Sequence, residues 1–110
     1  MEFRICGFLP KAASELGLDA VDLLLLETFL EEKRSEYIIE DSKVYYFLNV
    51  EKIKDDLPIL DMDKVSFYNK FKKMIELHVL EKCSEEQDYY TVGPNYYFLL
   101  DSDKYPKYNA

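Results

Sequence analysis

Apolar residues recur at helical spacing along the first third of the chain. A short helix is expected to begin at Pro10 and to end at Gly17, the usual order of these two residues around a helix. A second, wider apolar set predicts a core helix over 19–34. Asp19 and Asp22 form its acidic start, where carboxylates cap free N–H groups and favour the positive end of the helix dipole. The apolar positions are wide enough for burial on more than one side: Val21, Leu24, Leu25, Leu26, Phe29 and Leu30.

A short helix followed closely by a longer one is expected over 49–77. Asn49 is a good N-cap residue, and Pro58 must end the helix that Asn49 opens, because the residue before proline disfavours helical geometry. After a tight turn, Asp63 caps the next helix, which runs to the end of this range. The order of elements is that of a helix-turn-helix.

Two β-hairpins are expected from runs of β-branched and aromatic residues. The first joins 37–39 to 44–48 through a polar turn, and the second joins 79–83 to 89–92 through the polar loop 84–88. A hairpin that directly follows the second helix of a helix-turn-helix is a wing. The sequence therefore predicts a winged helix.

The predicted fold class is α+β, a single winged helix-turn-helix domain with an N-terminal helical extension. A chain of 110 residues is long enough for one core and too short for two ordinary domains. The domain is expected over 1–100, with its helix-turn-helix at about 49–77 and its wing at about 79–92. Residues 96–100 have no clear period, so a short helix that closes the core is expected, with a further strand as the alternative. The polar segment 101–110 is expected to fray as a tail or to begin a linker.

The sequence favours a cytoplasmic protein without membrane, metal or cofactor. Its apolar runs, such as 23–26, are far shorter than the roughly 20 residues of a spanning helix, and the first residues do not resemble a signal peptide. Cys6 and Cys83 are far apart and lack metal-ligand spacing, so two reduced thiols are expected. No cofactor-binding or metal site is expected.

The only histidine, His78, offers no catalytic pattern. A general base needs partners, and no nucleophile or ligand lies at a meaningful spacing from this residue. We expect His78 to be structural, at the end of a helix and in a left-handed conformation. The acidic pairs of the sequence are ordinary solvated carboxylates. The chain is therefore expected not to be an enzyme, and no catalytic residue is proposed.

The formal net charge of −8 disfavours nucleic acid, because phosphate neutralisation supplies most non-specific affinity. One segment has the opposite sign: residues 64–82 hold five lysines against two glutamates. This segment contains the second helix of the predicted helix-turn-helix. A basic surface on an acidic body is expected to bind DNA weakly and with strong dependence on salt.

A helical wheel divides residues 64–78 into two faces. The core face is expected to hold Phe67, Tyr68, Phe71, Met74 and Ile75. The opposite arc holds Val65, Ser66, Asn69, Lys70 and Lys73, with Lys72 at its margin. Amide, hydroxyl and ammonium groups suit contacts with phosphates and base edges. A face that is merely solvated is the alternative.

Lys70 and Lys73 are expected to be exposed on this arc. Exchange of both for glutamate should therefore abolish retention of DNA while the thermal midpoint stays within a few degrees, since surface changes usually cost under about 0.5 kcal/mol.

The segment 49–82 reads NVEKIKDDLPILDMDKVSFYNKFKKMIELHVLEK, with a helix that ends at Leu-Pro-Ile-Leu and a lysine-rich helix after it. It resembles the winged-helix N-terminal domain of plasmid replication initiators of the RepA type and of phage replisome organisers. Together with 3–5 and 16–20, the resemblance covers about 1–92. It implies a bacterial DNA-binding module in replication initiation, whose recognition helix would face double-stranded DNA with Lys64, Ser66, Asn69, Lys70 and Lys73.

A second function class stays open, a winged helix used for protein–protein association without DNA. The net charge and the three acids of the predicted wing loop favour this alternative, and so do the tyrosine pairs, which suit packing or a protein interface better than base stacking. The partner would be a second copy or a replication or regulatory protein. The residues concerned are Glu85, Glu86, Asp88, Tyr45, Tyr46, Tyr89, Tyr90, Tyr96 and Tyr97.

Overall fold

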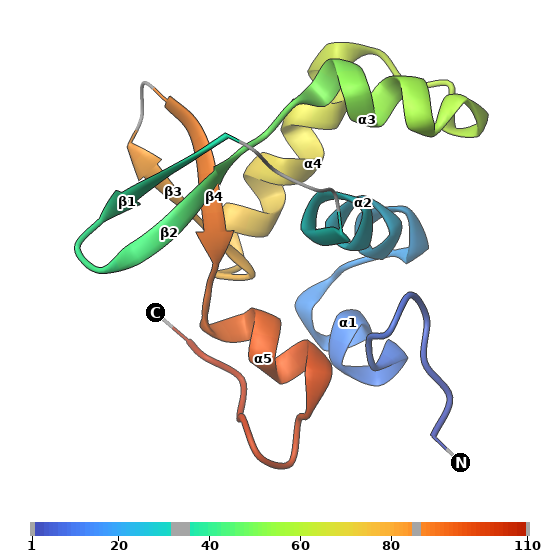
Figure 1. Cartoon of the computed structure of the whole chain (residues 1–110). Helices are drawn as coiled ribbons and strands as arrows, with labels where there is room; N and C mark the ends of the chain where they lie inside the picture. The colour runs from blue at the N-terminus through green and yellow to red at the C-terminus, as the bar shows by residue number, and fades with distance from the viewer. Residues whose placement is uncertain (1, 32–35, 85–86, 110) are drawn as a thin grey trace.

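The computed structural model describes residues 2–31, 36–84 and 87–109 and confirms the predicted α+β class (Figure 1). None of the described helices combines the length and the apolar character needed to cross a bilayer. The elements in chain order are α1 (Pro10–Leu16), α2 (Ala20–Glu31), β1 (Tyr37–Glu40), β2 (Lys43–Phe47), α3 (Val50–Asp56), the 3-10 turn η1 (Pro58–Leu60), α4 (Lys64–Glu76), β3 (Leu80–Ser84), β4 (Gln87–Val92) and α5 (Pro94–Leu100).

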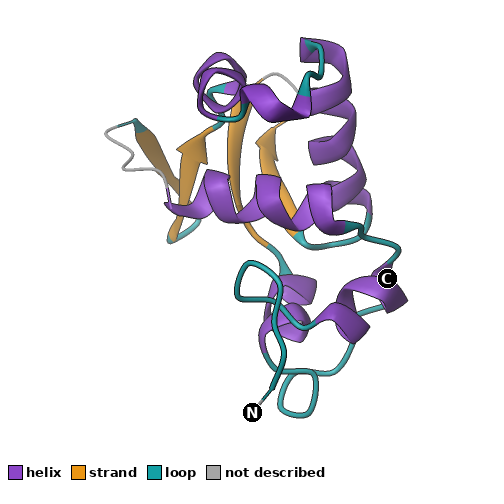
Figure 2. Cartoon of the chain, turned by 90° about the vertical axis from the view of Figure 1, so that its right-hand side faces the viewer, coloured by secondary structure: helices purple, strands orange, loops and turns teal. Residues whose placement is uncertain are grey.

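The two predicted hairpins form one antiparallel sheet with the strand order β1-β2-β4-β3. The junction is the pairing of Tyr46 with Tyr90 and of Phe47 with Tyr89. Figure 2 shows helices in front of this sheet, on one of its faces. The sequence predicted both hairpins but not their junction, because β2 and β4 lie far apart in the chain.

The core lies between α2, α4 and one face of the sheet. Phe29 of α2 packs edge-on against Phe71 of α4 and Tyr90 of β4, with ring centroids 5.9 and 6.2 Å away. All three side chains are buried. Aromatic rings favour such edge contacts, which add to the stabilisation from burial. The packing of these rings fixes α4 against the sheet.

Polar caps start the helices where the sequence predicts. The Asn49 side chain accepts a hydrogen bond from the Lys52 N–H, and Asp63 accepts one from the Ser66 N–H. Each such cap satisfies an N–H group that the helix leaves free. Proline then ends the first of these two helices, since α3 stops at Asp56 and the 3-10 turn begins at Pro58.

Some element boundaries differ from the predictions. β3 extends to Ser84 and β4 begins at Gln87, so the five-residue loop predicted over 84–88 is shorter, and Glu85 and Glu86 lie outside the described residues. α5 begins at Pro94 because proline is favoured in the first turn. α2 is described to Glu31, and the rest of the helix predicted over 19–34 lies beyond the described range.

The end of α4 is bonded to the start of α5. His78 has a φ of 60°, the predicted left-handed conformation, and its carbonyl oxygen accepts a hydrogen bond from the Asn95 N–H at 2.9 Å. Gly93 lies against the same carbonyl group, so closely that a Cβ atom there would be 2.5 Å from the oxygen. Backbone groups thus bond the end of α4 directly to the start of α5.

The buried Asn95 side chain also binds the C-terminal segment. Its amide nitrogen donates to the carbonyl oxygens of Leu77 and Tyr108, at 2.8 and 3.1 Å, and its oxygen accepts from the Tyr108 N–H at 2.8 Å. The Tyr108 ring meets the His78 ring edge-on at 5.0 Å. Hydrogen bonds from a residue within α5 thus hold the C-terminal segment, for which a fraying tail or the start of a linker was expected, as far as Tyr108.

Candidate nucleic-acid interface

One stripe of α4 is exposed to solvent. Val65, Asn69, Lys72 and Glu76 are exposed and recur at the three- and four-residue spacing of a single helix face. Val65 is 67% exposed although it is apolar. We call these four residues the outer stripe. Any partner that approaches α4 from solvent meets them first.

A groove of about 430 Å³ lies between α4 and the β3–β4 hairpin. Within it, Lys82 lies over the Tyr90 ring at 5.8 Å and 3.9 Å from the Asp88 carboxylate, while the Tyr68 hydroxyl is 3.5 Å from the same carboxylate. Both hairpin and helix thus supply polar groups to one concave surface. The lining residues are Tyr68, Asn69, Lys72, Ile75, Glu76, Lys82, Asp88 and Tyr90.

Lys70 and Lys73 do not lie on the outer stripe, which corrects the expectation that both are exposed there. The Lys73 ammonium is 2.8 Å from Asp22 Oδ2, and the Lys70 ammonium is 3.4 Å from Asp22 Oδ1 and 3.3 Å from an Asp19 oxygen. The two lysine side chains are only 37% and 27% exposed. They face the start of α2 instead of solvent.

Asp22 caps the start of α2 and also pairs with lysines of α4. Its side chain is 0% exposed and accepts a hydrogen bond from the Asp19 N–H, while Asp19 accepts one from the Asp22 N–H. A buried carboxylate needs compensating positive charge. The lysines of α4 supply it. A helical wheel cannot show this pairing, because the partner carboxylates come from a different helix.

The pKa values of this cluster reflect the same contacts. The backbone N–H of Asp22, followed by the Lys70 ammonium, lowers the pKa of Asp19 from its ordinary value. Partial burial alone would lower the pKa of Lys70, but the carboxylates of Asp22 and Asp19 outweigh it and raise that pKa. These contacts therefore favour the charged forms of Asp19 and Lys70.

The other predicted contact residues divide between the two sides of α4. Asn69 and Lys72 lie in the outer stripe and also line the groove. Lys64 is exposed at the start of the helix, where its ammonium is 2.9 Å from the Glu51 carboxylate of α3. Ser66 is half-buried and, by its spacing, shares the side of Lys70 and Lys73. Contact of any of them with DNA stays a prediction.

Sequence reasoning missed three residues of the groove. Tyr68 was expected in the core, but it is half-buried and open to the groove. Lys82 and Tyr90 pair across β3 and β4, so their side chains share one face of the sheet. The alternation of Leu80 and Lys82 carried a signal, because residues two apart in a strand point the same way. The strand pattern does not show which helix faces the side chains of Lys82 and Tyr90.

Tyr90, which lines the groove, makes the stability of the fold sensitive to alkaline pH. Burial of the phenol, together with the Asp88 carboxylate and Tyr68, raises the pKa of Tyr90 from 10.0 to about 12. When the pKa of a group is higher in the folded state than in the unfolded state, its contribution to stability is complete below the unfolded pKa. That contribution is lost as pH rises to the folded-state pKa. We therefore expect the free energy of unfolding to fall as pH rises from 10 to about 12. Urea denaturation at several pH values should show a smaller fall for Tyr90→Phe, and an equal fall would contradict this assignment.

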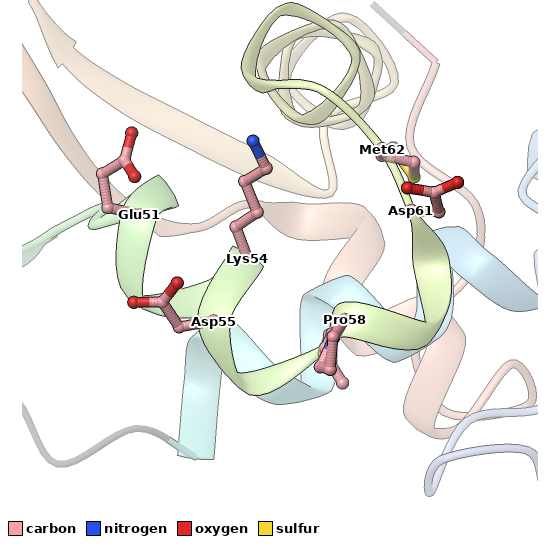
Figure 3. Close-up of a pocket in the computed structure, with 7 residues that line it drawn as sticks. Glu51, Lys54, Asp55, Pro58, Asp61 and Met62 are labelled. Carbon is pink, nitrogen blue, oxygen red and sulfur yellow. The ribbon is translucent and has the colours of Figure 1, made fainter.

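A second hollow, of about 360 Å³, lies beside α3 and η1 (Figure 3). The Lys54 side chain extends from α3 beside the carboxylates of Glu51 and Asp55, and Asp61 lies further along the turn. Within the described ranges no group of three histidine, cysteine or acidic residues could hold a metal ion. This second hollow is lined mainly by charged side chains of α3 and the turn that follows it.

Comparison of the chain with family models, curated proteins and solved structures finds no match.

Proposed function

We propose that this chain is a winged-helix module that binds double-stranded DNA through α4 and the β3–β4 hairpin. In this interpretation α3, η1 and α4 are the helix-turn-helix, and the hairpin is the wing. The module would serve a replication initiator or regulator of a plasmid, phage or other mobile element, and would bind rather than catalyse. The observation that carries the proposal is the position of the outer stripe beside the wing, with Asn69 and Lys72 open to solvent.

The chemistry of the outer stripe suits a major groove, which admits an α-helix. The Asn69 amide can donate and accept on one base edge, as adenine recognition requires. Lys72 would neutralise a phosphate beside it. Lys82 of the wing would reach the backbone on the other side of the groove. Phosphate contacts would thus position α4, and Asn69 would read sequence.

The ion pairs of α4 limit the affinity that this surface can supply. Lys64, Lys70 and Lys73 already neutralise carboxylates of the same protein. Only a few lysines are then available to displace counterions from DNA. With two to four phosphate contacts, log affinity should fall against log salt with a slope of about −2 to −4.

The proposal predicts that Lys72→Glu weakens duplex binding at least tenfold at low salt, because a phosphate contact becomes a repulsion. Fluorescence anisotropy with a labelled duplex of mixed sequence measures the affinity. The matched control is Lys11→Glu, which makes the same charge change at an exposed position of α1. Equal weakening by both variants would show that only net charge matters and would remove the role of α4.

Protein–protein association without DNA is the second candidate. It is favoured by apolar side chains on the surface near the helix-turn-helix, since Ile59 of η1 is 84% exposed and Val65 of α4 is 67% exposed. Exposed apolar groups that cluster mark interaction sites. Sedimentation and anisotropy on the same sample separate the two candidates. Self-association without retention of duplex DNA at low salt would favour the second and exclude the first.

A further inference from the structure

The face of the sheet opposite α2 and α4 carries aromatic residues. The strand register places Ile38, Tyr45, Phe47, Tyr89 and Thr91 on this face, because Ile38 pairs with Tyr45 and Phe47 pairs with Tyr89, the neighbour of the core residue Tyr90. We call it the back face. A solvated sheet face usually carries polar side chains. The residues at the centre of the back face are aromatic instead.

No described helix covers the back face. Figures 1 and 2 together show α2 and α4 on the other side of the strands. Tyr46 and Tyr90 belong to the core or pack against it, whereas Tyr45, Phe47 and Tyr89 are half-buried and are outside that cluster. Their partial burial comes from their neighbours in the sheet: the rings of Phe47 and Tyr89 lie 5.6 Å apart.

Carboxylates surround these rings. The Tyr89 hydroxyl donates to Glu36 at 2.9 Å, which holds one carboxylate at the edge of the aromatic group. The register places Glu40 and Glu81 on the same face. Lys43 is the cation that the described part of this face provides, and its ammonium is already 3.0 Å from Glu81. The back face is thus aromatic in the middle and negative at its edges.

We propose that the back face docks an extended, cationic segment of a protein partner, one with arginine or lysine side chains between apolar residues. Cations bind over aromatic rings, and the carboxylates of Glu36 and Glu40 add charge complementarity. The same carboxylates repel the phosphates of single-stranded nucleic acid, although its bases could stack on the rings. They also repel a second copy of this acidic face. A cationic peptide satisfies both features of the surface.

This surface is separate from the proposed DNA-binding face, so each can be tested without the other. The probe is a capped hexapeptide of alternating arginine and leucine, titrated into ¹⁵N-labelled full chain and followed by amide shifts. We expect saturable shifts centred on Tyr45, Phe47 and Tyr89. Glu36→Gln with Glu40→Gln should weaken binding roughly 3- to 10-fold, as expected for the loss of two exposed charge contacts.

The matched control is Glu15→Gln with Glu31→Gln, which removes the same charge from exposed positions of α1 and α2 and should leave the affinity unchanged. Tyr45→Thr, which keeps a good strand residue, should weaken binding with the amide spectrum otherwise intact. Equal loss in the control pair would show non-specific attraction to an acidic protein. Shifts located elsewhere, or tighter binding of oligothymidylate than of the peptide, would also overturn the proposal.

Discussion

Replacement of Phe71 by alanine is expected to lower the free energy of unfolding by roughly 3–5 kcal/mol. The ring is fully buried in the centre of the core, where it contacts Phe29 and Tyr90. Loss of the side chain removes buried apolar surface and leaves a cavity that the surrounding aromatic rings cannot fill. Small domains have a total stability of only about 5–15 kcal/mol, so urea denaturation should show a large shift of the midpoint.

Val65→Ala is the matched control for Phe71→Ala, since it shortens an apolar side chain of the same helix at a position that is 67% exposed. Its effect should stay within about 0.5 kcal/mol. Similar losses in both variants would mean that α4 does not present Phe71 to the core. The interpretation of the outer stripe would then fail as well.

The exchange of both Lys70 and Lys73 for glutamate is expected to destabilise the fold by about 2–4 kcal/mol, in contrast to the small change that the helical wheel predicted. Asp22 would remain buried without a positive partner and would face two new negative charges. Breaking a fully buried ion pair costs about 3–5 kcal/mol. We expect somewhat less here because the lysine side chains are 27% and 37% exposed.

Lys64→Glu with Lys72→Glu is the control for this exchange, with the same charge change on the same helix at exposed positions. Its cost should stay below about 1 kcal/mol, the range of surface ion pairs. Thermal denaturation of the two double variants measures the difference. Equal midpoints would contradict a structural role of the Asp22 cluster. Lys72→Glu is the better test of DNA binding, since its effect on affinity is separate from unfolding.

Local signals in the sequence predicted the elements well. Asn49, Asp63 and Pro58 act within three or four residues of their own positions, so residue type alone was enough to place α3 and α4. The left-handed conformation of His78 was predicted for a similar reason, because a helix that turns sharply into a strand needs such a residue.

Contacts between distant segments could not be predicted. Lys70 and Lys73 bind carboxylates 51 residues earlier in the chain, and β2 joins β4 across more than 40 residues. A wheel assigns every lysine opposite the apolar face to solvent, since it includes no neighbouring helix. For this reason the sequence named Lys70 and Lys73 as DNA contacts but did not identify the groove beside Lys82.

The backbone junction between α4 and α5 implies a pattern that relatives of this chain should share even where their surfaces differ. Position 93 leaves no room for a side chain, so glycine is required there as long as the His78 carbonyl keeps its place. Position 78 accepts residues that tolerate a φ of 60°, which are chiefly glycine, asparagine, aspartate and histidine. Position 95 needs a side chain that both donates and accepts, as asparagine does. Three positions with this spacing would identify the fold in sequences whose surface residues have diverged beyond recognition.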